Sequence, residues 1–270
     1  MYLIVMPPTT KVVTIQAMTP FRKPLEHPIA RTLFRFVERD LRRYPDVYVA
    51  VSNTTKKDLH ELLDVPLDAI FVAQPGVDAD EFRPGVGPRP AAMKDDKINI
   101  LHVGNAYPRK GVHFLVEALG KIDASRYRLV RVGPRPDPIY ARRYADRARE
   151  LGVDLVEVGY AARKDLPAYF AHADLFVFPS VDEDAPMPPL EAMACGTNVL
   201  LSDIEPHKER GGDLAFFFRT GDAESLASAI EPALRNRRPA DRLRSHATAY
   251  SWGLAADAYA QAYAQAGIEL

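Results

Sequence analysis

Two carboxylates stand eight residues apart in the segment 175–196, LFVFPSVDEDAPMPPLEAMACG. The apolar run 175–178 predicts a short buried strand that ends at Pro179, and a helix is predicted shortly after it. Glu183 falls in the acidic loop between them, and Glu191 falls in the first turn of the helix. Ligands of open parallel sheets bind outside the carboxyl ends of the strands, so both glutamates would lie near such a site. Each has a simpler alternative: Glu191 could only complement the helix dipole, and Glu183 could be a solvated charge.

A cationic counterpart lies upstream in the segment 104–111, GNAYPRKG. A glycine at a strand end, followed by a helix start, offers free N–H groups and a helix dipole to an anion. Lys110 adds a point charge suited to phosphate, with Arg109 beside it. The segment matches neither GxGxxG nor the P-loop pattern, so a plain turn with exposed basic residues remains an alternative. A phosphate site and a carboxylate site for sugar hydroxyls at one sheet edge would together describe a nucleotide-sugar pocket.

The elements that must position these groups alternate regularly from Ile98 onward. Apolar runs predict strands at 98–103, 127–132, 153–158, 175–178, 198–202 and 214–218. Helices are predicted between them at 112–119, 139–151, 166–171, 190–194 and 224–235. This alternation implies an α/β fold, a Rossmann-like parallel sheet with helices on both faces. Gly104, Gly133 and Gly159 follow three of the strands, where the chain must turn sharply.

The first 84 residues predict a partial, smaller α/β domain. Strands are expected at 11–15, 46–51 and 71–74, and helices at 29–44 and 53–63, the second capped by Ser52. The Gly- and Pro-rich segment 85–97 is interpreted as an interdomain linker. We therefore expect a truncated N-terminal segment at 1–84, the linker at 85–97 and the Rossmann-like domain at 98–246. A C-terminal helix within 247–270, spanning 247–266, would pack back on the N-terminal part.

Bulk composition limits the class of protein. The chain has 270 residues with 26% charged residues and a net charge of −1, which is ordinary for a soluble globular protein and gives no reason to expect nucleic acid. The single cysteine, Cys195, excludes an internal disulfide framework and fits a reducing compartment. Because no apolar run reaches transmembrane length, a cytoplasmic location is predicted. No histidine pair has metal-ligand spacing, and His102 and His113 are interpreted as structural.

A basic stripe runs along the helix expected at 29–44. Arg31, Arg35 and Arg39 recur every four residues, with Arg42 and Arg43 beyond them. One interpretation is a solvated face on a helix that packs by its other side. The other is a surface for anionic lipid head groups, an anionic acceptor or a partner chain, which would place the protein at the membrane periphery.

The segment PSVDEDAPMPPLEAMACGTNVLLSD resembles the E-x7-E segment of retaining GT-B glycosyltransferases of the family 4 type, the glycosyl transferases group 1, with Glu183 and Glu191 in the two glutamate places. VGNAYPRKGVHFLVEAL and VEVGYAARKDLPAYFAHADLFVFPS resemble two further stretches of that family. The likeness extends over residues 46–265. It implies the C-terminal domain of a GT-B fold, which holds the sugar donor, preceded by a truncated N-terminal domain.

The resemblance also implies roles for particular residues. Lys110, with Arg109 beside it, would hold and stabilise the donor's phosphate, and Glu183 would touch the donor sugar. The nucleotide would be bound by the following residues, with Glu191 on the ribose and 160–164 beside the base: Gly104, Asn105, Tyr160, Arg163, Leu190 and Glu191. The donor would be a UDP- or GDP-sugar, with no true cofactor and no metal. The leaving phosphate would assist a same-face attack by an unknown acceptor, either a glycan, a lipid or a small molecule.

Three departures from the family pattern keep two hypotheses open. Asn105 stands where an arginine is usual, and Arg109 or Arg135 would have to compensate. Asp184, Ala185 and Pro186 change the loop after the first glutamate, and Gln16 and Ala17 occupy the places of a His-Asp pair. The chain is therefore either a minimal retaining glycosyltransferase or a non-catalytic nucleotide-sugar-binding subunit of a split GT-B enzyme. A third interpretation is a different Rossmann-fold nucleotide binder. A homodimer or a partner chain would cover apolar surface left by the truncated domain.

Overall fold

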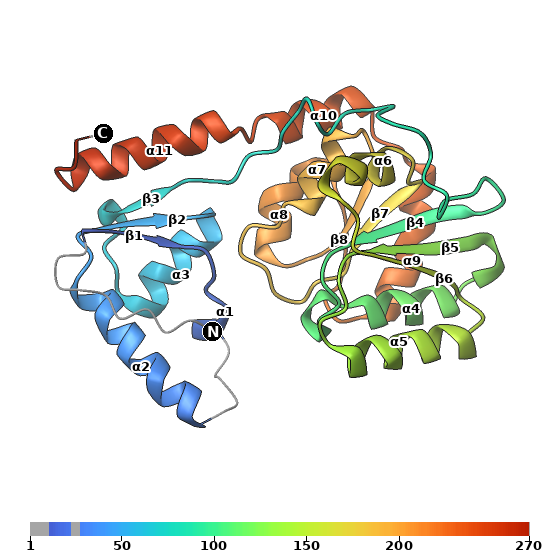
Figure 1. The fold of residues 1–270 in the computed structure, drawn as a ribbon, viewed down its shortest axis with the longest axis horizontal. Coiled ribbons are helices and arrows are strands. Elements are labelled where there is room, and N and C mark those ends of the chain that lie inside the picture. The colour runs from blue at the N-terminus through green and yellow to red at the C-terminus, as the bar shows by residue number, and fades with distance from the viewer. Residues whose placement is uncertain (1–10, 23–27, 270) are drawn as a thin grey trace. The chain divides into compact units, whose positions relative to one another are not determined.

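The computed structural model describes residues 11–22 and 28–269, without the side chains of 28–33, and divides into two compact units (Figure 1). Unit 1 comprises Met1–Gly76, Glu183–Ala185 and Tyr250–Leu270, as far as these are described. Unit 2 comprises Val77–Asp182 and Pro186–Ala249.

The boundary between the units falls earlier than the linker expected at 85–97. The chain passes from unit 1 to unit 2 after Gly76, and residues 85–97 lie inside unit 2. They are packed there: Met93 is buried, and the Asn99 side-chain amide donates to the carbonyl oxygens of Lys94 and Lys97. The Gly- and Pro-rich composition of this segment is typical of a flexible linker. The buried Met93 and the hydrogen bonds from Asn99 of β4 instead fix the segment to the sheet.

Unit 2 is built on a six-stranded parallel sheet with the order β6-β5-β4-β7-β8-β9. The strands are β4 (Ile98–Val103), β5 (Tyr127–Val132), β6 (Asp154–Gly159), β7 (Leu175–Phe178), β8 (Val199–Ser202) and β9 (Phe216–Phe218). The order reverses between β4 and β7, which are hydrogen-bonded neighbours with Ile100 beside Leu175. Such a reversal is the switch point at which doubly wound sheets bind their ligands. The expected Rossmann-like parallel sheet is confirmed.

Helices cover both faces of this sheet (Figure 1). One layer shares an apolar cluster with the strands and contains α4 (Val112–Gly120), α5 (Pro138–Glu150) and α9 (Ala223–Arg235). The other layer packs around α7 and contains α6 (Leu166–Ala171), α7 (Pro188–Ala194), α8 (Glu205–Gly211) and α10 (Ala240–Thr248). Because both faces are covered, β7 reads as a continuous apolar run, and every one of its residues is buried.

Unit 1 holds a three-stranded parallel sheet with the order β1-β2-β3. Its elements are β1 (Val12–Ile15), α1 (Thr19–Arg22), α2 (Pro28–Arg43), β2 (Val47–Ala50), α3 (Asn53–Leu63), β3 (Ile70–Val72) and α11 (Trp252–Gln265). Side chains of β2 alternate between two clusters, since Tyr48 packs with Leu59 of α3 and Val49 packs with Ala262 of α11. Thus α11 covers the sheet face opposite α3. The predicted cap of α3 is confirmed, because Ser52 accepts a hydrogen bond from the Thr55 N–H at 3.0 Å.

The helix expected over 247–266 corresponds to α11, which begins only at Trp252. α10 ends at Thr248, and Ser251 caps α11 by accepting a hydrogen bond from the Leu254 N–H at 3.2 Å. The chain packs closely at this break, since a Cβ on Gly76 would lie 2.3 Å from the Ser251 carbonyl carbon. The sequence also did not reveal α8 or α10 as helices, and His207 lies buried in α8.

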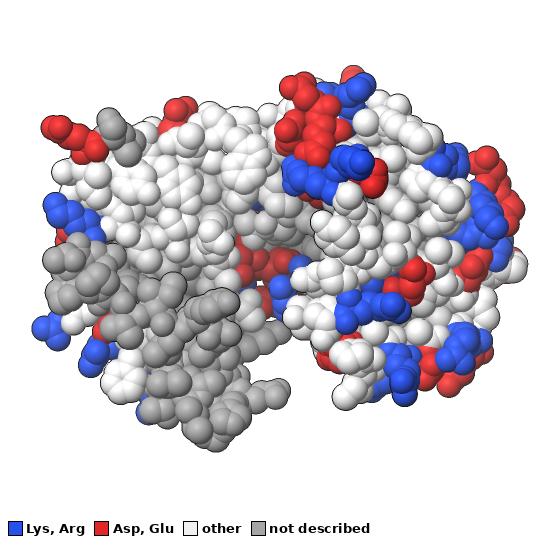
Figure 2. Space-filling view, viewed as in Figure 1, with Lys and Arg blue, Asp and Glu red and all other residues white. Residues whose placement is uncertain are grey.

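The surface of unit 2 mixes positive and negative charges on the face drawn in Figure 2. Pairs such as Arg147–Glu117 and Lys121–Glu224 join oppositely charged side chains at 2.6 and 2.8 Å. Alternating signs at short spacing cancel within a Debye length, so the field over this face is short-ranged. Within the part of the chain that the structure describes, none of the helices combines the length and apolar character needed to cross a membrane.

Candidate functional site

Two loops meet at the switch point of the unit 2 sheet. The basic turn, residues 104–111, follows β4, and the acidic loop, residues 179–187, follows β7. The two strands are parallel neighbours, so both loops leave the sheet at its carboxyl edge. Segments about 70 residues apart in sequence are therefore brought together.

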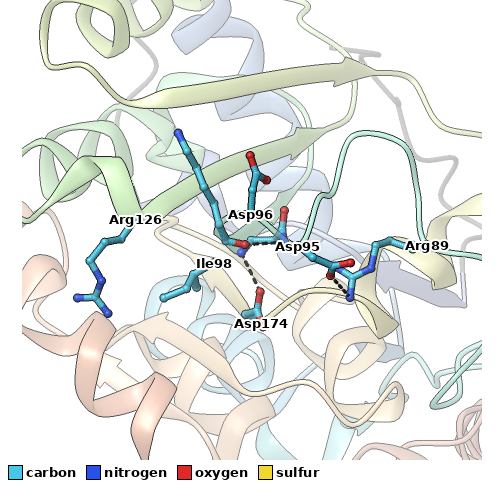
Figure 3. Close-up of a pocket in the computed structure, with 8 residues that line it drawn as sticks. Arg89, Asp95, Asp96, Ile98, Arg126 and Asp174 are labelled. Atoms are coloured by element: carbon cyan, nitrogen blue, oxygen red, sulfur yellow. Dashed lines mark hydrogen bonds and ion pairs between the residues drawn. The ribbon is translucent and has the colours of Figure 1, made fainter.

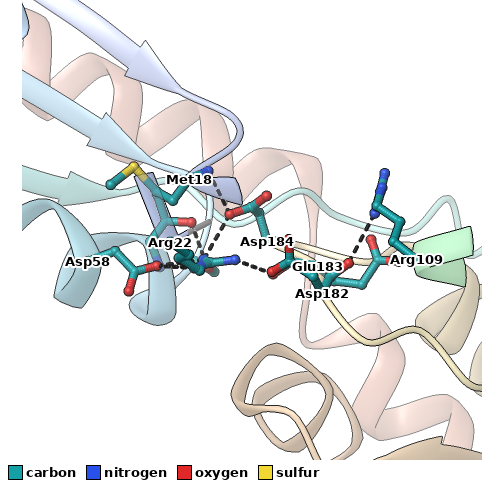
Figure 4. A network of polar contacts seen from close by, with 9 residues as sticks. Met18, Arg22, Asp58, Arg109, Asp182, Glu183 and Asp184 are labelled. Atoms are coloured by element: carbon teal, nitrogen blue, oxygen red, sulfur yellow. Dashed lines mark hydrogen bonds and ion pairs between the residues drawn. The ribbon is translucent and has the colours of Figure 1, made fainter. Parts of the chain in front are cut away.

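Two hydrogen bonds join the basic turn to the start of the acidic loop. The Val181 N–H donates to the Arg109 carbonyl oxygen at 2.8 Å. The Arg109 guanidinium donates to the Asp182 carbonyl oxygen at 3.0 Å (Figure 4). Gly111 lies against the same segment, because a Cβ there would come within 2.0 Å of the Pro179 carbonyl oxygen. Arg109 thus holds the two loops together, in addition to any contact it makes with a ligand.

Lys110 lies at the carboxyl edge over an aromatic ring. It ends the short 3₁₀ turn Pro108–Lys110, and its Nζ lies 5.0 Å from the centroid of the Phe178 ring at the end of β7. The side chain is half-buried, so its charge is only partly screened. Beneath it, His102 is fully buried; burial first, and then the charges of Arg131 and Lys110, lower its pKa to about 3. His102 is therefore neutral at physiological pH and adds no positive charge to the site.

The backbone N–H groups of Gly104 and Asn105, at the start of the basic turn, differ in their hydrogen bonding. Gly104 has a φ of +148°, a conformation that L side chains rarely adopt, and its N–H donates to the Val132 carbonyl oxygen. Asn105, which stands in the arginine place, is exposed, as is Arg135. Among the described residues, none accepts a hydrogen bond from the Asn105 backbone N–H. An exposed, unused amide at a strand end is a donor that a phosphate oxygen can accept from.

Glu191 is a buried carboxylate in the first turn of α7. It is 8% exposed, and burial is the main cause that raises its pKa to about 7; the nearby Arg163 charge opposes the shift and Glu81 adds to it. Leu190 beside it is completely buried. Among the described residues, none donates a hydrogen bond to the Glu191 carboxylate. A buried acceptor of this kind suits paired hydroxyl groups, which would donate to it.

The segment predicted to border a base lies after β6. Tyr160 is 79% exposed, and Arg163 starts a 3₁₀ turn, where it pairs with Glu81 at 2.7 Å and lies over the Phe82 ring. Arg163 also lowers the pKa of Glu191, which brings these two predicted residues into one electrostatic neighbourhood. An exposed tyrosine ring offers a stacking face to a planar base.

Glu183 belongs to the three-residue segment that is part of unit 1 (Figure 4). Its carbonyl oxygen accepts a hydrogen bond from Arg22 at 3.0 Å, and the next residue, Asp184, accepts from the Met18 N–H and from Arg22, both at 2.9 Å. Arg22 also pairs with Asp58. Asp184 stands where the family usually has a glycine, and its side chain fixes residues 183–185 by hydrogen bonds from Met18 and Arg22. Sequence reasoning missed Arg22, whose partners are 36 and more than 160 residues away.

An open pocket of about 410 Å³ lies at the other edge of the unit 2 sheet (Figure 3). Ile98, Arg126 and Asp174 of its lining begin or precede β4, β5 and β7. Its charges are satisfied, since Arg89 pairs with Asp95 at 3.0 Å and the Asn99 N–H donates to Asp174. Ligands of this fold bind at the carboxyl edge, so this pocket is separate from the candidate site. Across the described parts of the chain, no cluster of His, Cys, Asp and Glu suits a metal ion.

Solved structures resemble the whole described fold. Sucrose-phosphate synthase from Thermosynechococcus elongatus gives a TM-score of 0.80 at 22% identity, over 94% of this chain and 67% of that one. HepE of Anabaena, in complex with UDP, gives 0.78 at 18% identity, over 95% and 72%. At these identities the likeness shows the fold, the α/β arrangement of GT-B proteins.

The sequence comparisons identify the family. O-antigen chain mannosyltransferase RfbU of Salmonella typhimurium is 29% identical over 230 residues, which cover 81% of this chain and 59% of that protein. The chain thus spans less than two thirds of this curated relative. Residues 88–250 match the family model described as glycosyl transferases group 1. Because that match covers more than half of the chain, the protein belongs to the glycosyl transferases group 1 family.

Proposed function

We propose that this chain is a retaining glycosyltransferase that moves a sugar from a nucleotide diphosphate donor to an acceptor. The observation that carries the proposal is the pair of hydrogen bonds joining the basic turn to the acidic loop, through Arg109, Val181 and Asp182. The basic turn carries a lysine suited to phosphate, and the helix after the acidic loop carries a buried carboxylate suited to hydroxyls. Family membership and the UDP bound to HepE support the same donor class.

In the proposed reaction the donor's sugar–phosphate bond breaks and negative charge develops on the leaving diphosphate. Lys110 would stabilise that charge, and the Asn105 N–H would donate to a phosphate oxygen. Glu191 would accept hydrogen bonds from the ribose, and Tyr160 and Arg163 would border the base. Glu183 would contact the donor sugar. Attack on the same face of the sugar then retains its configuration, with the acceptor's proton passing to the leaving phosphate.

The donor assignment is tested by calorimetric titration of the purified chain with UDP, GDP and their sugars. Binding of one nucleotide with micromolar affinity is the expected result. If neither UDP, GDP nor any UDP- or GDP-sugar bound the wild-type chain, the proposed donor site would be contradicted. Measured hydrolysis or transfer with the nucleotide-sugar that binds then tests the enzymatic part.

A second function, a nucleotide-sugar-binding subunit without independent catalysis, is favoured by Asn105. This residue provides an amide where the family usually has an arginine, and Gln16 replaces a residue of the His-Asp pair. With half of the cationic clamp absent, the leaving phosphate has less stabilisation. Turnover by the purified chain alone, abolished in Lys110→Ala, would eliminate the subunit function. Nucleotide binding without turnover, followed by turnover when a partner chain is added, would establish it.

Glu191→Gln is predicted to change the pH dependence of nucleotide binding. Hydroxyl donors bind the ionised carboxylate, so with a pKa of about 7 the wild-type affinity should rise several-fold between pH 6 and pH 8. The terminal phosphate of free UDP or GDP titrates in the same range, whereas a nucleotide-sugar has no such group. The informative quantity is therefore the difference between wild type and variant. The variant should bind more weakly at pH 8 and lack this part of the rise. Identical profiles would contradict the ribose role.

The same substitution should affect stability in the opposite direction. The folded-state pKa of about 7 exceeds the usual 4.5, so the stability that Glu191 contributes is full below pH 4.5 and is lost as the pH rises through 7. Above pH 7 the variant should therefore be more stable than wild type, by at most about 3 kcal/mol. Chemical denaturation at pH 5 and pH 8 measures this. Weaker binding together with greater stability distinguishes a binding residue from a structural one.

Helix α2 of unit 1 supports a contact of this chain with an anionic lipid surface. Arg35 and Arg39 are exposed, and Phe36 between them is 50% exposed with the Arg39 guanidinium 5.3 Å from its ring centroid. Arg39 pairs with Asp40 at 3.0 Å, and Arg42 pairs with Glu38 and Asp64, so only part of the stripe carries free charge. Co-sedimentation with phosphatidylglycerol vesicles should be reduced in Arg35→Ala/Phe36→Ala. If the wild-type chain sedimented equally with neutral and with phosphatidylglycerol vesicles, the proposed contact with anionic lipid would be contradicted.

A further inference from the structure

A buried arginine lies directly beneath the basic turn, outside the residues assigned above. Arg131 on β5 has a completely buried side chain. Its guanidinium donates to the Gly104 carbonyl oxygen at 3.0 Å and to the Gly133 carbonyl oxygen at 2.6 Å. These two glycines end neighbouring strands, so one side chain fixes the backbone of both strand ends. A Cβ on Gly133 would lie 2.4 Å from the Gly104 carbonyl oxygen, which shows how closely the two turns pack.

The charge of Arg131 is neutralised inside the sheet. Its Nε donates to both carboxylate oxygens of Glu157 on β6, at 2.8 and 2.7 Å, and the Tyr144 hydroxyl donates to the same carboxylate at 2.7 Å. A buried ion pair contributes little net stability compared with apolar residues of similar volume. Such pairs can instead serve to fix one geometry, which is the role that the carbonyl contacts indicate here.

The geometry of the peptide bond connects this arrangement to the ligand edge. The described chain contains no cis peptide bond, so in the Gly104–Asn105 peptide the C=O and N–H point in opposite directions. Because Arg131 holds the Gly104 oxygen from the interior, the Asn105 N–H must point outward. This is the amide for which the described residues supply no acceptor.

We propose that Arg131 is a positioning residue for the donor's diphosphate. By donating hydrogen bonds to the Gly104 and Gly133 carbonyl oxygens, it orients the Asn105 backbone N–H toward a phosphate oxygen. The inference rests on the proposed nucleotide-sugar site and deepens it. It also accounts for a chain that lacks the usual arginine at position 105: a main-chain donor, held from below, serves where a side-chain donor is missing.

The test compares nucleotide affinity and stability in three variants. Arg131→Met removes the carbonyl contacts and leaves the Glu157 carboxylate, which is 16% exposed, without its cationic partner, so the variant should be less stable than wild type. Arg131→Met/Glu157→Gln removes both charges and keeps a partner for the Tyr144 hydroxyl, so it should recover stability. Arg128→Met is the matched control, because Arg128 lies on the same strand and pairs with Asp96 and Asp154 away from the turn. Each is titrated with whichever of UDP and GDP binds the wild type, and with the corresponding nucleoside.

The double variant should bind the nucleoside diphosphate about tenfold more weakly than wild type and the nucleoside equally well, since only the phosphate contact depends on Arg131. Arg128→Met should bind both like wild type. Wild-type affinity for the diphosphate in the folded double variant would overturn the inference while leaving the proposed function intact. Equal loss of nucleoside and diphosphate binding would also overturn it, as general damage to the site. Failure of the wild type to bind either nucleotide would remove the proposed function and, with it, this inference.

Discussion

Lys110→Ala is expected to lower the rate of sugar transfer about a thousandfold, with a much smaller effect on stability. Charge develops on the leaving diphosphate as the reaction proceeds, and removal of one preorganised donor to such a charge typically costs 10²–10³ in rate, roughly. Lys110 is the half-buried cation of the basic turn, whereas Arg109 already donates to the Asp182 carbonyl oxygen. Steady-state kinetics with the nucleotide-sugar that binds the wild type measure the loss.

The division of the effect between kcat and KM makes this prediction specific. A group that acts mainly in the transition state should lower kcat far more than it raises KM. The contact with the Phe178 ring is worth only about 1 kcal/mol, so the variant should fold. Lys121→Ala is the matched control, because Lys121 pairs with Glu224 at the far end of α4. A loss in Lys110→Ala no larger than in Lys121→Ala would remove Lys110 from the reaction.

Much of the unit 2 fold could be predicted because its signals are local. Largely apolar runs marked β4, β5 and β7 to the residue, and β7, which is covered on both faces, is apolar throughout. The positive φ angles of Gly104, Gly133 and Gly159 agree with the sharp turns expected there. The alternation of strands and helices then placed the basic turn and the acidic loop at one edge. The roles of Lys110, Glu183 and Glu191 came from resemblance, and those roles remain predictions.

What could not be predicted depends on partners distant in the chain. Arg131 sits inside the run YRLVRV, where an arginine looks like an exposed strand residue, and only Glu157 and two glycine carbonyls explain its burial. Arg22 likewise finds Asp184 across 162 residues. The linker was misplaced because a Gly- and Pro-rich composition does not report the buried Met93. A sequence shows which residues could pair, but tertiary packing decides which pairs form.

Gly111→Ala is expected to destabilise the protein by about 3 kcal/mol or more and to weaken nucleotide binding with it. Gly111 has a φ of +71°, which an alanine adopts only under strain. In addition, a Cβ there would lie 2.0 Å from the Pro179 carbonyl oxygen, a backbone atom that cannot rotate away. The basic turn would have to separate from the acidic loop, which would break the hydrogen bond from Val181 to Arg109 and displace Lys110. Urea denaturation and nucleotide titration measure the two losses.

Gly152→Ala separates the two causes of that loss. Gly152 has nearly the same φ, +68°, but an added Cβ there would meet no atom within 4 Å. Its substitution should therefore cost only the backbone strain, about 1 kcal/mol, and leave nucleotide affinity unchanged. If both variants lost the same stability, the contact with Pro179 would not constrain the turn. If Gly111→Ala lost stability but bound nucleotide as wild type does, the junction of the two loops would support the fold without shaping the donor site, and the observation that carries the proposed function would lose its force.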